Sequence, residues 1–334
     1  MSNRNKIRVS YLVSTRNRAA LLDRCLRNVR DFITPEDELI LMDGASTDDT
    51  AEVAKKHADI VTLFRSETDC GEAHGFNKGT LESRGRLIKW LTDDDYIYPA
   101  AMRKAICVME EHPEIDAIQC GGECYEISPS SGDSRFKFFE YLPPGQNLAG
   151  SFGIALRYVP CGLGLLVKRR CIALAGLFDV TYKAVDIDYL SKLMSSQAVL
   201  KYLNVKLYRH VEYPHSGQRN VPIVLRDQVR AQLRSAAWAE ARRGSHKVLA
   251  DALNLTQLHR GDMLAESIWY AIGFRQSRLS YLRLLNSQIR LLAACQRIVG
   301  RVGLRLGLCD AKRHAPPDPG LYPTEEPIWD GSLR

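Results

Sequence analysis

The chain has 334 residues, of which 45% are hydrophobic and 25% charged, a composition typical of a globular protein with one large domain and room for an appendage. The net charge of +7 is too small for this length to indicate a nucleic-acid partner, and none is expected. No stretch approaches 18 uncharged apolar residues, and residues 1–6 lead directly into a strand-like run. We therefore expect a cytoplasmic protein without a membrane-spanning helix or a secretory signal.

Strand-like runs alternate with helical runs from the amino terminus onward. The expected strands are residues 7–14, 38–42, 60–64 and 87–91, and the expected helices are residues 19–29, 49–57, 75–82 and 100–112. Such alternation predicts an α/β fold, with a mostly parallel, Rossmann-like mixed sheet flanked by helices. Further along we expect strands at 117–127 and 163–168, a loop at 143–152 and a helix at 188–195.

The carboxyl-terminal third differs in composition. Residues 219–314 have a basic, helical pattern, and residues 271–309 contain seven arginines but no lysine, aspartate or glutamate. On a helical projection the arginines edge an apolar face. Two hypotheses fit this helix: contact with an anionic membrane surface, or a face for a homo-oligomer or a neighbouring domain. Residues 315–334, with five prolines, predict an extended tail.

The nine cysteines are scattered, and most lie in apolar runs, which favours buried free thiols in a reducing compartment. Cys120 and Cys124 have the spacing of half a zinc site. No second Cys or His pair stands at a matching spacing, so we do not expect zinc.

Polar segments follow three of the expected strands, at residues 14–18, 43–48 and 92–95. Ligands of open α/β sheets bind beyond the carboxyl ends of the strands, so these segments are expected to meet in one crevice. The carboxylate of Asp43 can accept hydrogen bonds from a nucleobase or a ribose hydroxyl. Ser46 or Thr47 is expected to cap the helix that follows.

Three consecutive aspartates, Asp93, Asp94 and Asp95, stand directly after the apolar run 87–91. Their charges repel one another unless a cation or solvent relieves them. A hard cation held by carboxylates would neutralise a nucleotide diphosphate as it departs from a sugar. The alternative is a solvated acidic turn that caps the next helix.

Four segments carry a resemblance to a known family. They are residues 9–18, 39–50 (LILMDGASTDDT), 66–79 (SETDCGEAHGFNKG) and 85–99 (GRLIKWLTDDDYIYP). In this order they resemble glycosyltransferase family 2, and residues 161–193 resemble its acceptor half more weakly. The resemblance implies a GT-A catalytic domain at residues 1–218, with a nucleotide-sugar-binding half at 1–114 and an acceptor half at 115–218.

The same resemblance implies an activity. A nucleotide sugar, by default a UDP-sugar, would donate its sugar to a hydroxyl of a saccharide or lipid-linked saccharide acceptor, with inversion at the anomeric carbon. Mn²⁺ or Mg²⁺ would be the cofactor, and the setting would be bacterial-type polysaccharide or glycoconjugate synthesis. The expected location is the cytoplasm, and the alternative is peripheral attachment to the inner face of the cell membrane.

Site residues follow from the same motifs. Thr15 and Arg18 lie where the family's first strand meets the nucleotide, and Asp43 matches its base-contacting acid. Asn77 is expected to brace the donor pocket, as is Lys78 unless it is a solvated helix residue.

In the acidic motif, Asp94 is the expected metal contact, Asp93 contacts ribose or metal, and Asp95 contacts the sugar or caps a helix. Thr92 stands where many members have Asp or Asn, and Ser14 stands where proline is frequent. These departures leave the role of Asp93 open.

The acceptor half holds the expected catalytic base. An inverting transfer needs a base that removes the proton of the acceptor hydroxyl as that hydroxyl attacks. Asp186 is the candidate and Asp188 the reserve, although either aspartate could also cap a helix. His215 falls where related enzymes have a residue that reaches the diphosphate or the metal, and its alternative is a structural or surface role.

Two other functions compete with this interpretation. A nucleotidyltransferase acting on sugar phosphates also uses metal-binding aspartates. Such enzymes have a Gly-rich, basic loop after the first strand, whereas residues 14–18 of this chain contain no glycine. A catalytically inactive module that binds nucleotide sugars is the second alternative.

Overall fold

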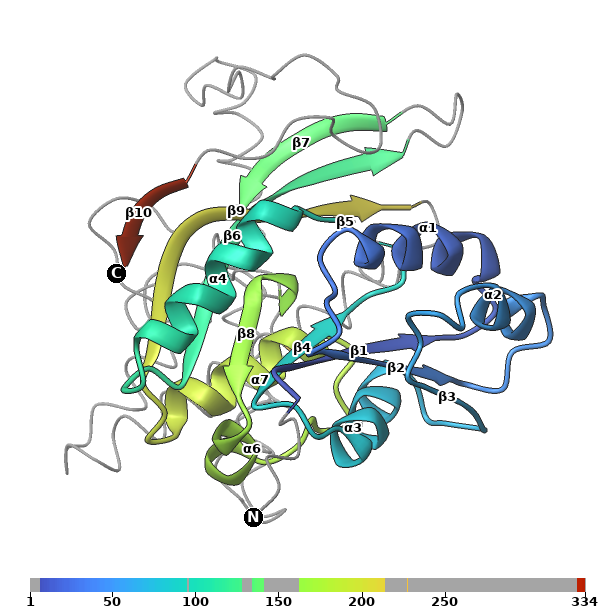
Figure 1. Cartoon of the computed structure of the whole chain (residues 1–334), viewed down its shortest axis with the longest axis horizontal. Coiled ribbons are helices and arrows are strands. Elements are labelled where there is room, and N and C mark those ends of the chain that lie inside the picture. The colour runs from blue at the N-terminus through green and yellow to red at the C-terminus, as the bar shows by residue number, and fades with distance from the viewer. Residues whose placement is uncertain are drawn as a thin grey trace, which may run out of the picture.

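The computed structural model describes residues 7–94, 96–127, 134–140, 162–213, 227 and 329–333. Figure 1 shows a central sheet with helices packed around it. The strands are β1 (Val9–Thr15), β2 (Glu38–Asp43), β3 (Leu63–Ser66), β4 (Leu87–Leu91), β5 (Tyr96–Ile97), β6 (Ala117–Ile127), β7 (Ser134–Glu140), β8 (Leu165–Lys168), β9 (Leu200–Glu212) and β10 (Trp329–Leu333). The helices are α1 (Ala19–Arg30), α2 (Thr50–Lys56), α3 (Glu72–Glu82), α4 (Pro99–Glu111), the 3₁₀ turn η1 (Gly162–Gly164), α6 (Arg170–Ala175) and α7 (Val185–Ser195).

The described strands form one mixed sheet in the order β10-β9-β6-β8-β4-β1-β2-β3, with β5 paired to β9 and β7 to β6. In the first half, β1 runs parallel to both β2 and β4, and β2 runs parallel to β3. Strand β8 is antiparallel to both β4 and β6 and thereby joins the two halves. The predicted α/β fold with a mixed sheet is confirmed.

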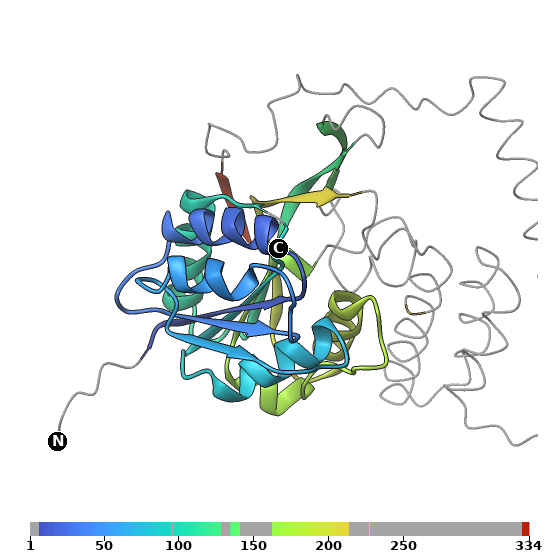
Figure 2. The same ribbon diagram turned by 90° about the vertical axis from the view of Figure 1, so that its right-hand side faces the viewer.

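Both faces of the sheet are covered. Val9, Tyr11 and Val13 of β1 pack in one apolar cluster with α1 and α4, and Leu12 packs in another with α3 and α7. Successive strand residues point to opposite faces, so a strand covered on both sides needs apolar residues almost throughout. In Figure 2, α1 and α2 lie above the sheet and α3 and α7 below it.

Several element boundaries differ from those expected, among them the start of the helix expected at 188–195, which lies at Val185. The strand expected at 60–64 begins at Leu63, because the preceding residues turn and the Val61 N–H donates to the carbonyl of His57 over 3.1 Å. The helix expected at 75–82 begins at Glu72, directly after Gly71, whose φ of 112° suits glycine. Strand β10, within the expected tail 315–334, pairs antiparallel with β9.

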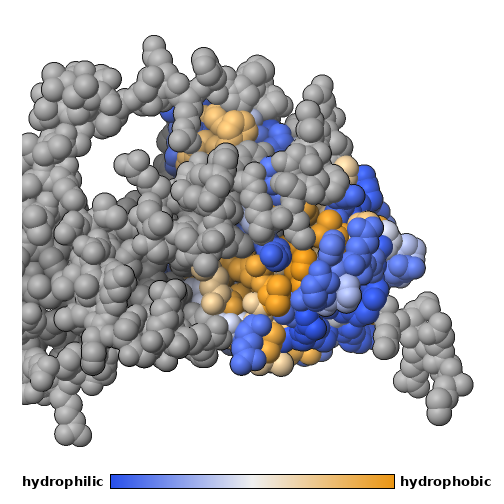
Figure 3. Space-filling model, turned by 90° about the vertical axis from the view of Figure 1, so that its left-hand side faces the viewer, coloured by the Kyte–Doolittle hydropathy of each residue, from blue (hydrophilic) through white to orange (hydrophobic). Residues whose placement is uncertain are grey.

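Exposed apolar side chains are few in the described part of the chain. The large apolar side chains that are more than a third exposed are Leu81, Phe138, Phe139, Leu174, Val180 and Val199, of which Phe138 and Phe139 are neighbours in β7. Figure 3 shows a face on which apolar residues gather beside hydrophilic ones. No described helix is long and apolar enough to cross a membrane.

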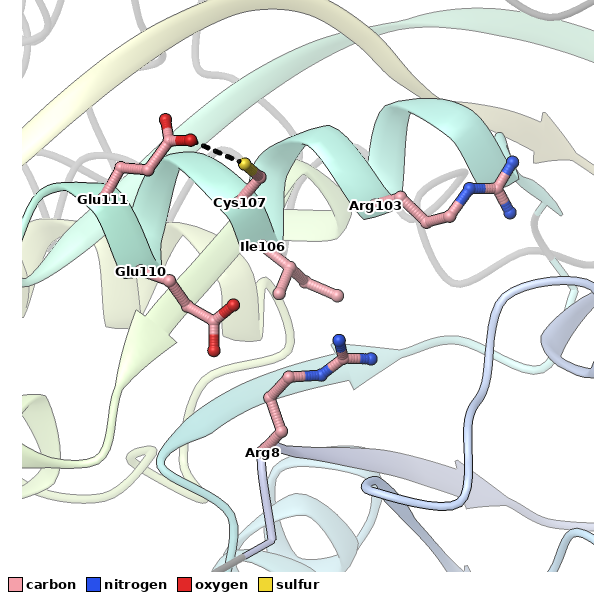
Figure 4. Close-up of a pocket in the computed structure, with 6 residues that line it drawn as sticks. All are labelled: Arg8, Arg103, Ile106, Cys107, Glu110 and Glu111. Atoms are coloured by element: carbon pink, nitrogen blue, oxygen red, sulfur yellow. Dashed lines mark hydrogen bonds between the residues drawn. The ribbon is translucent and has the colours of Figure 1, made fainter.

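A surface pocket of about 390 Å³ lies beside α4. Figure 4 shows its lining residues, which are Arg8, Arg103, Ile106, Cys107, Glu110 and Glu111. The Cys107 thiol donates to Glu111 over 3.0 Å, and this carboxylate raises the pKa of the thiol. Arg8 directly precedes β1, so the pocket lies toward the amino end of that strand, away from the polar segments at the carboxyl ends.

Candidate active site

The carboxyl ends of β1, β2 and β4 meet at one edge of the sheet. Thr15 of β1 is paired with Asp43 of β2, and Val13 of β1 is paired with Leu91 of β4. Asp93 and Asp94 follow β4 by two and three residues. The predicted convergence of the three polar segments is therefore present in the structure.

Asp93 is the buried centre of this cluster, with 2% of its surface exposed. Its carboxylate accepts a 2.6 Å hydrogen bond from the Thr15 hydroxyl and another of 2.6 Å from the Arg18 guanidinium. Burial, and then the charge of Asp94, raises the pKa of Asp93 to about 7, while Arg18 and Thr15 oppose this rise. Negative charge at this position is therefore under-compensated by the protein.

Arg18 also contacts the Asp94 carboxylate, so one guanidinium serves two acids. The Asp94 side chain is 13% exposed. The alternative of a helix-capping acidic turn is not observed for these two residues. The next helix, α4, has Tyr98 at its N-cap, begins with Pro99 and has no side-chain cap.

The described residues contain no group of three His, Cys, Asp or Glu side chains arranged to hold a metal ion. A divalent cation in a nucleotide site is commonly bound through only one or two carboxylates, and substrate phosphates and water complete its shell. Two adjacent carboxylates that share one guanidinium, with Asp94 partly exposed, fit such a cation. Cys120 and Cys124 are both fully buried free thiols.

Asp43 organises the turn after β2. It is 3% exposed and accepts hydrogen bonds of 2.5 Å from the hydroxyls of Ser46 and Ser66. Ala45, directly before Ser46, has a φ of 58°, a left-handed conformation that costs a non-glycine residue about 1–2 kcal/mol. Asn17, in the turn after β1, is also left-handed and accepts the Thr47 N–H over 2.8 Å. The two turns thus hold each other in a strained arrangement beside the acidic pair.

The expectation that Ser46 or Thr47 caps the next helix is wrong. Ser46 donates to Asp43, and Thr47 contacts Asn17. Asp48 instead accepts the N–H of Thr50, the first residue of α2, over 3.2 Å. It also accepts the N–H of Ala19, the first residue of α1, over 3.0 Å. Because the Ser46 and Thr47 hydroxyls bind Asp43 and Asn17, the first N–H of α2 donates to Asp48 instead.

Asp186 stands in the first turn of α7 and is partly buried. Its carboxylate accepts the N–H of Gly162 over 3.1 Å and that of Ile187 over 2.9 Å. Burial raises its pKa, and His210 opposes this effect while Glu140 adds to it. A Cβ atom on Gly162 would lie 2.3 Å from the Cβ of Asp186, so this turn approaches the aspartate as only glycine can.

Asp188, the reserve candidate, has a different environment. It is fully buried, it accepts the Asp179 N–H over 2.9 Å, and it pairs with Lys192 one turn along α7 at 2.9 Å. These contacts give Asp188 a structural role. Neither aspartate is the N-cap residue, which is Ala184.

Asn77 does not point toward the acidic cluster. Its amide nitrogen donates to the carbonyl of Phe178 over 2.9 Å, and its amide oxygen accepts the Phe178 N–H over 2.8 Å. Asn77 therefore ties α3 to the segment that precedes α7. Lys78 contacts the Thr68 carbonyl and Glu67.

Asp95, His215 and the arginines of residues 271–309 lie outside the described residues. Two site features were missed by the sequence reasoning. Asp69 lies beside the turn after β2, since a Cβ atom on Gly44 would stand 3.1 Å from its carboxylate. The same carboxylate accepts the N–H of Gly71 over 2.8 Å, in a turn that leads into α3, and an aspartate two residues before a glycine is a local sequence pattern for such a turn. Asp227 contacts the residues before α7 and has no local signal at all.

Comparison with known proteins agrees with this geometry. Residues 10–157 match the family described as Glycosyl transferase family 2. An uncharacterized glycosyltransferase of Haemophilus influenzae is 25% identical over 58% of this chain, and the match spans 64% of that protein, just under two thirds. A PGL/p-HBAD biosynthesis glycosyltransferase of Mycobacterium bovis is 29% identical over 61% of this chain and 77% of its own length.

Solved structures show the same fold at low sequence identity. S. aureus TarS 1-349, crystallised in complex with UDP-GlcNAc, superposes with a TM-score of 0.57 at 14% identity, over 95% of this chain and 100% of that one. A longer S. aureus TarS structure gives a TM-score of 0.55 over 86% of this chain and 55% of that chain. Residues 10–157, just under half of the chain, thus match glycosyltransferase family 2, and the sheet has the GT-A fold of these solved structures.

Proposed function

We propose that this protein transfers a sugar from a nucleotide sugar to a hydroxyl of a saccharide or lipid-linked saccharide acceptor, with inversion. One observation carries the proposal. The buried Asp93 and the partly exposed Asp94 share Arg18, and Asp93 also accepts from Thr15, at the same sheet edge as Asp43. The TarS structure with UDP-GlcNAc supports a UDP-sugar as the default donor.

Each group at this edge has a part in donor binding. Asp43 would accept a hydrogen bond from the base or the ribose, and its fixed position in the turn after β2 limits the entropy lost on binding. Arg18, with its side chain 35% exposed, would turn part of its charge toward the diphosphate. Asp93, held by Thr15, would contact the ribose or the metal.

Mn²⁺ or Mg²⁺ bound at Asp94 would supply positive charge to the diphosphate as it leaves the sugar. Among the described residues one guanidinium serves these two carboxylates, which favours a further cation at the site. In this proposal, Asp95 and His215 are further candidates for contacts with the sugar and the metal.

Asp186 would act as the base. It takes the proton of the acceptor hydroxyl as that oxygen bonds to the anomeric carbon, while the bond from this carbon to the phosphate oxygen breaks and its electron pair leaves with the nucleotide. A carboxylate whose pKa is raised by burial is a stronger base than an exposed one. Asp188 is committed to Lys192, which supports Asp186 for this role.

The proposal is tested by incubating the full chain with UDP-GlcNAc and Mn²⁺ and following UDP release, with water as the acceptor. We expect Asp94→Ala to lower the turnover on the order of 100-fold, a typical loss for one electrostatic contact to developing charge. Asp59→Ala is the matched control, because Asp59 is an exposed aspartate paired with Arg30. Equal UDP release by the wild type and Asp94→Ala would contradict the proposal.

The same assay addresses the alternatives. A nucleotidyltransferase would form a nucleotide sugar from a nucleoside triphosphate and a sugar phosphate, and an inactive module would bind UDP-GlcNAc without turnover. Inversion is checked by proton NMR, because the α-linked donor should first release β-configured GlcNAc. A thermal-shift series with UDP, GDP and dTDP sugars then identifies the base, since binding to the native state raises its melting temperature.

We also propose that the protein acts in the cytoplasm, with residues 271–309 on an anionic membrane surface or in a homo-oligomer. The support is their arginine content without acidic residues. Co-sedimentation with vesicles that contain an anionic lipid, at low and high salt, separates the two ideas. Binding that salt releases supports the membrane, and its absence together with a dimer in solution supports the oligomer.

A further inference from the structure

The segment that leads into α7 is fastened at several points. Asn77 of α3 holds both polar backbone groups of Phe178, and Lys192 of α7 donates to the Leu177 carbonyl over 2.8 Å. Asp188 accepts the N–H of Asp179. The beginning of this segment is therefore fixed to the donor half and to α7 itself.

The end of the segment is held differently. Helix α7 begins at Val185 after Ala184, which has no side chain that can cap a helix. The backbone directly before the helix is held instead by Asp227, more than forty residues along the chain. One of its carboxylate oxygens accepts the N–H of Lys183 over 2.6 Å and the N–H of Ala184 over 3.2 Å.

Asp227 is fully buried, with 0% of its surface exposed. A buried carboxylate is costly unless it accepts hydrogen bonds, and a negative charge is favourable at a helix N-terminus. Both conditions are met at the start of α7. The contact therefore fixes the backbone of residues 183 and 184, directly before α7 begins at Val185.

We infer that Asp227 is a positioning residue that sets the place of the Asp186 carboxylate, so that one residue from beyond the expected catalytic domain at 1–218 helps to complete the catalytic site. This inference rests on the proposed function, in which Asp186 is the base. Asp186 contacts Gly162 on the other side, so a shift of the α7 N-terminus moves the carboxylate relative to the sheet. Displacing a catalytic group by about 1 Å can lower a rate about 100-fold.

The test compares Asp227→Ala and Asp227→Asn in the full chain. The asparagine retains an oxygen that accepts both N–H groups, and the alanine does not. Three quantities are measured: the turnover of UDP-GlcNAc with water as acceptor, the Kd for UDP, and hydrogen exchange of the Lys183 and Ala184 amides. Asp37→Ala is the matched control, because it also removes a buried carboxylate that accepts a backbone N–H, that of Thr34, but before β2 at the opposite end of the sheet.

We expect Asp227→Ala to lower the turnover at least about 10-fold with an unchanged Kd for UDP and faster exchange at residues 183 and 184. Asp227→Asn should restore most of the turnover, and the folded fraction of Asp37→Ala should keep it. Wild-type turnover in Asp227→Ala would overturn the inference. Equal losses in the alanine and asparagine variants, or a loss of UDP binding that parallels the loss of turnover, would overturn it as well.

A different observation would overturn the proposed function. If the wild type itself neither binds nor turns over a nucleotide sugar, the function is overturned, and the positioning role with it, even where the two amides are protected. If the wild type is active and Asp227→Ala equals it, only the positioning role is lost.

Discussion

The hydroxyl of Thr15 donates a 2.6 Å hydrogen bond to the carboxylate of Asp93, a residue 78 positions away in the sequence. This contact joins the end of β1 to the acidic segment after β4. Arg18 adds a second contact of 2.6 Å to the same carboxylate. The acidic segment is thus fixed by the neighbouring strand before any donor arrives, which reduces the ordering that binding requires.

Asp93 makes the stability of the metal-free protein depend on pH. Its pKa of about 7 lies above the ordinary value of 3.8, so between these values the folded protein keeps a proton that the unfolded chain has lost. The free energy of unfolding therefore falls as pH rises through this window, by up to about 4 kcal/mol. We therefore expect the difference in melting temperature, Asp93→Asn minus wild type, to be larger at pH 8 than at pH 4 when both are measured in EDTA.

Asp23 provides a control of opposite sign. Hydrogen bonds from Lys56 and then from His57 lower the pKa of Asp23, so its ionised form stabilises the folded state above the ordinary pKa of an aspartate. Asp23→Asn should therefore lose stability at neutral pH. A melting-temperature difference for Asp93→Asn that is the same at pH 4 and pH 8 would contradict the assignment of a raised pKa.

Arg18→Gln removes the guanidinium that serves Asp93 and Asp94. We expect the Kd for UDP, measured by calorimetry in Mn²⁺, to rise about 10-fold, because one charge-assisted contact to the diphosphate is lost. Arg27→Gln on the same helix is the control, since its side chain is 65% exposed and pairs with Asp23. An unchanged Kd in Arg18→Gln would remove Arg18 from the donor site.

Asp186→Asn and Asp188→Asn should separate chemistry from stability. The first keeps the shape of the side chain but cannot take a proton, so kcat should fall 10²- to 10⁴-fold with an unchanged Kd for UDP. The second breaks a pair with Lys192 and should cost about 3 kcal/mol of unfolding free energy while the folded fraction stays active. The reverse pattern would make Asp188 the base.

Gly162→Ala tests the close approach of η1 to α7. The added Cβ would stand 2.3 Å from the Cβ of Asp186, so either the turn or Asp186 must move. We expect kcat to fall at least about 10-fold with UDP binding retained. In the control, Gly79→Ala, the nearest atom is the flexible Met42 side chain at 3.2 Å, and activity should persist. Equal activities of the two variants would show that η1 does not constrain Asp186.

The sequence by itself determined the alternation of strands and helices in the first half and the position of Thr15, Asp43 and Asp93 near strand ends. These features depend on local patterns, since a strand buried on both faces must be apolar nearly throughout and a polar residue marks its end. The motif order also indicated the family, which the comparison confirms.

Tertiary structure decided the rest. Only the fold shows that Asp188 is paired with Lys192 while Asp186 faces Gly162, because the two acids are alike in the sequence. Asp48, and not Ser46 or Thr47, accepts the N–H of Thr50, while Ser46 donates to Asp43 and the Thr47 N–H donates to Asn17. Asp227 holds the backbone before α7 from a distant part of the chain. A hydrogen bond forms between whatever groups folding brings within about 3 Å, and no local pattern encodes a partner that is distant in sequence.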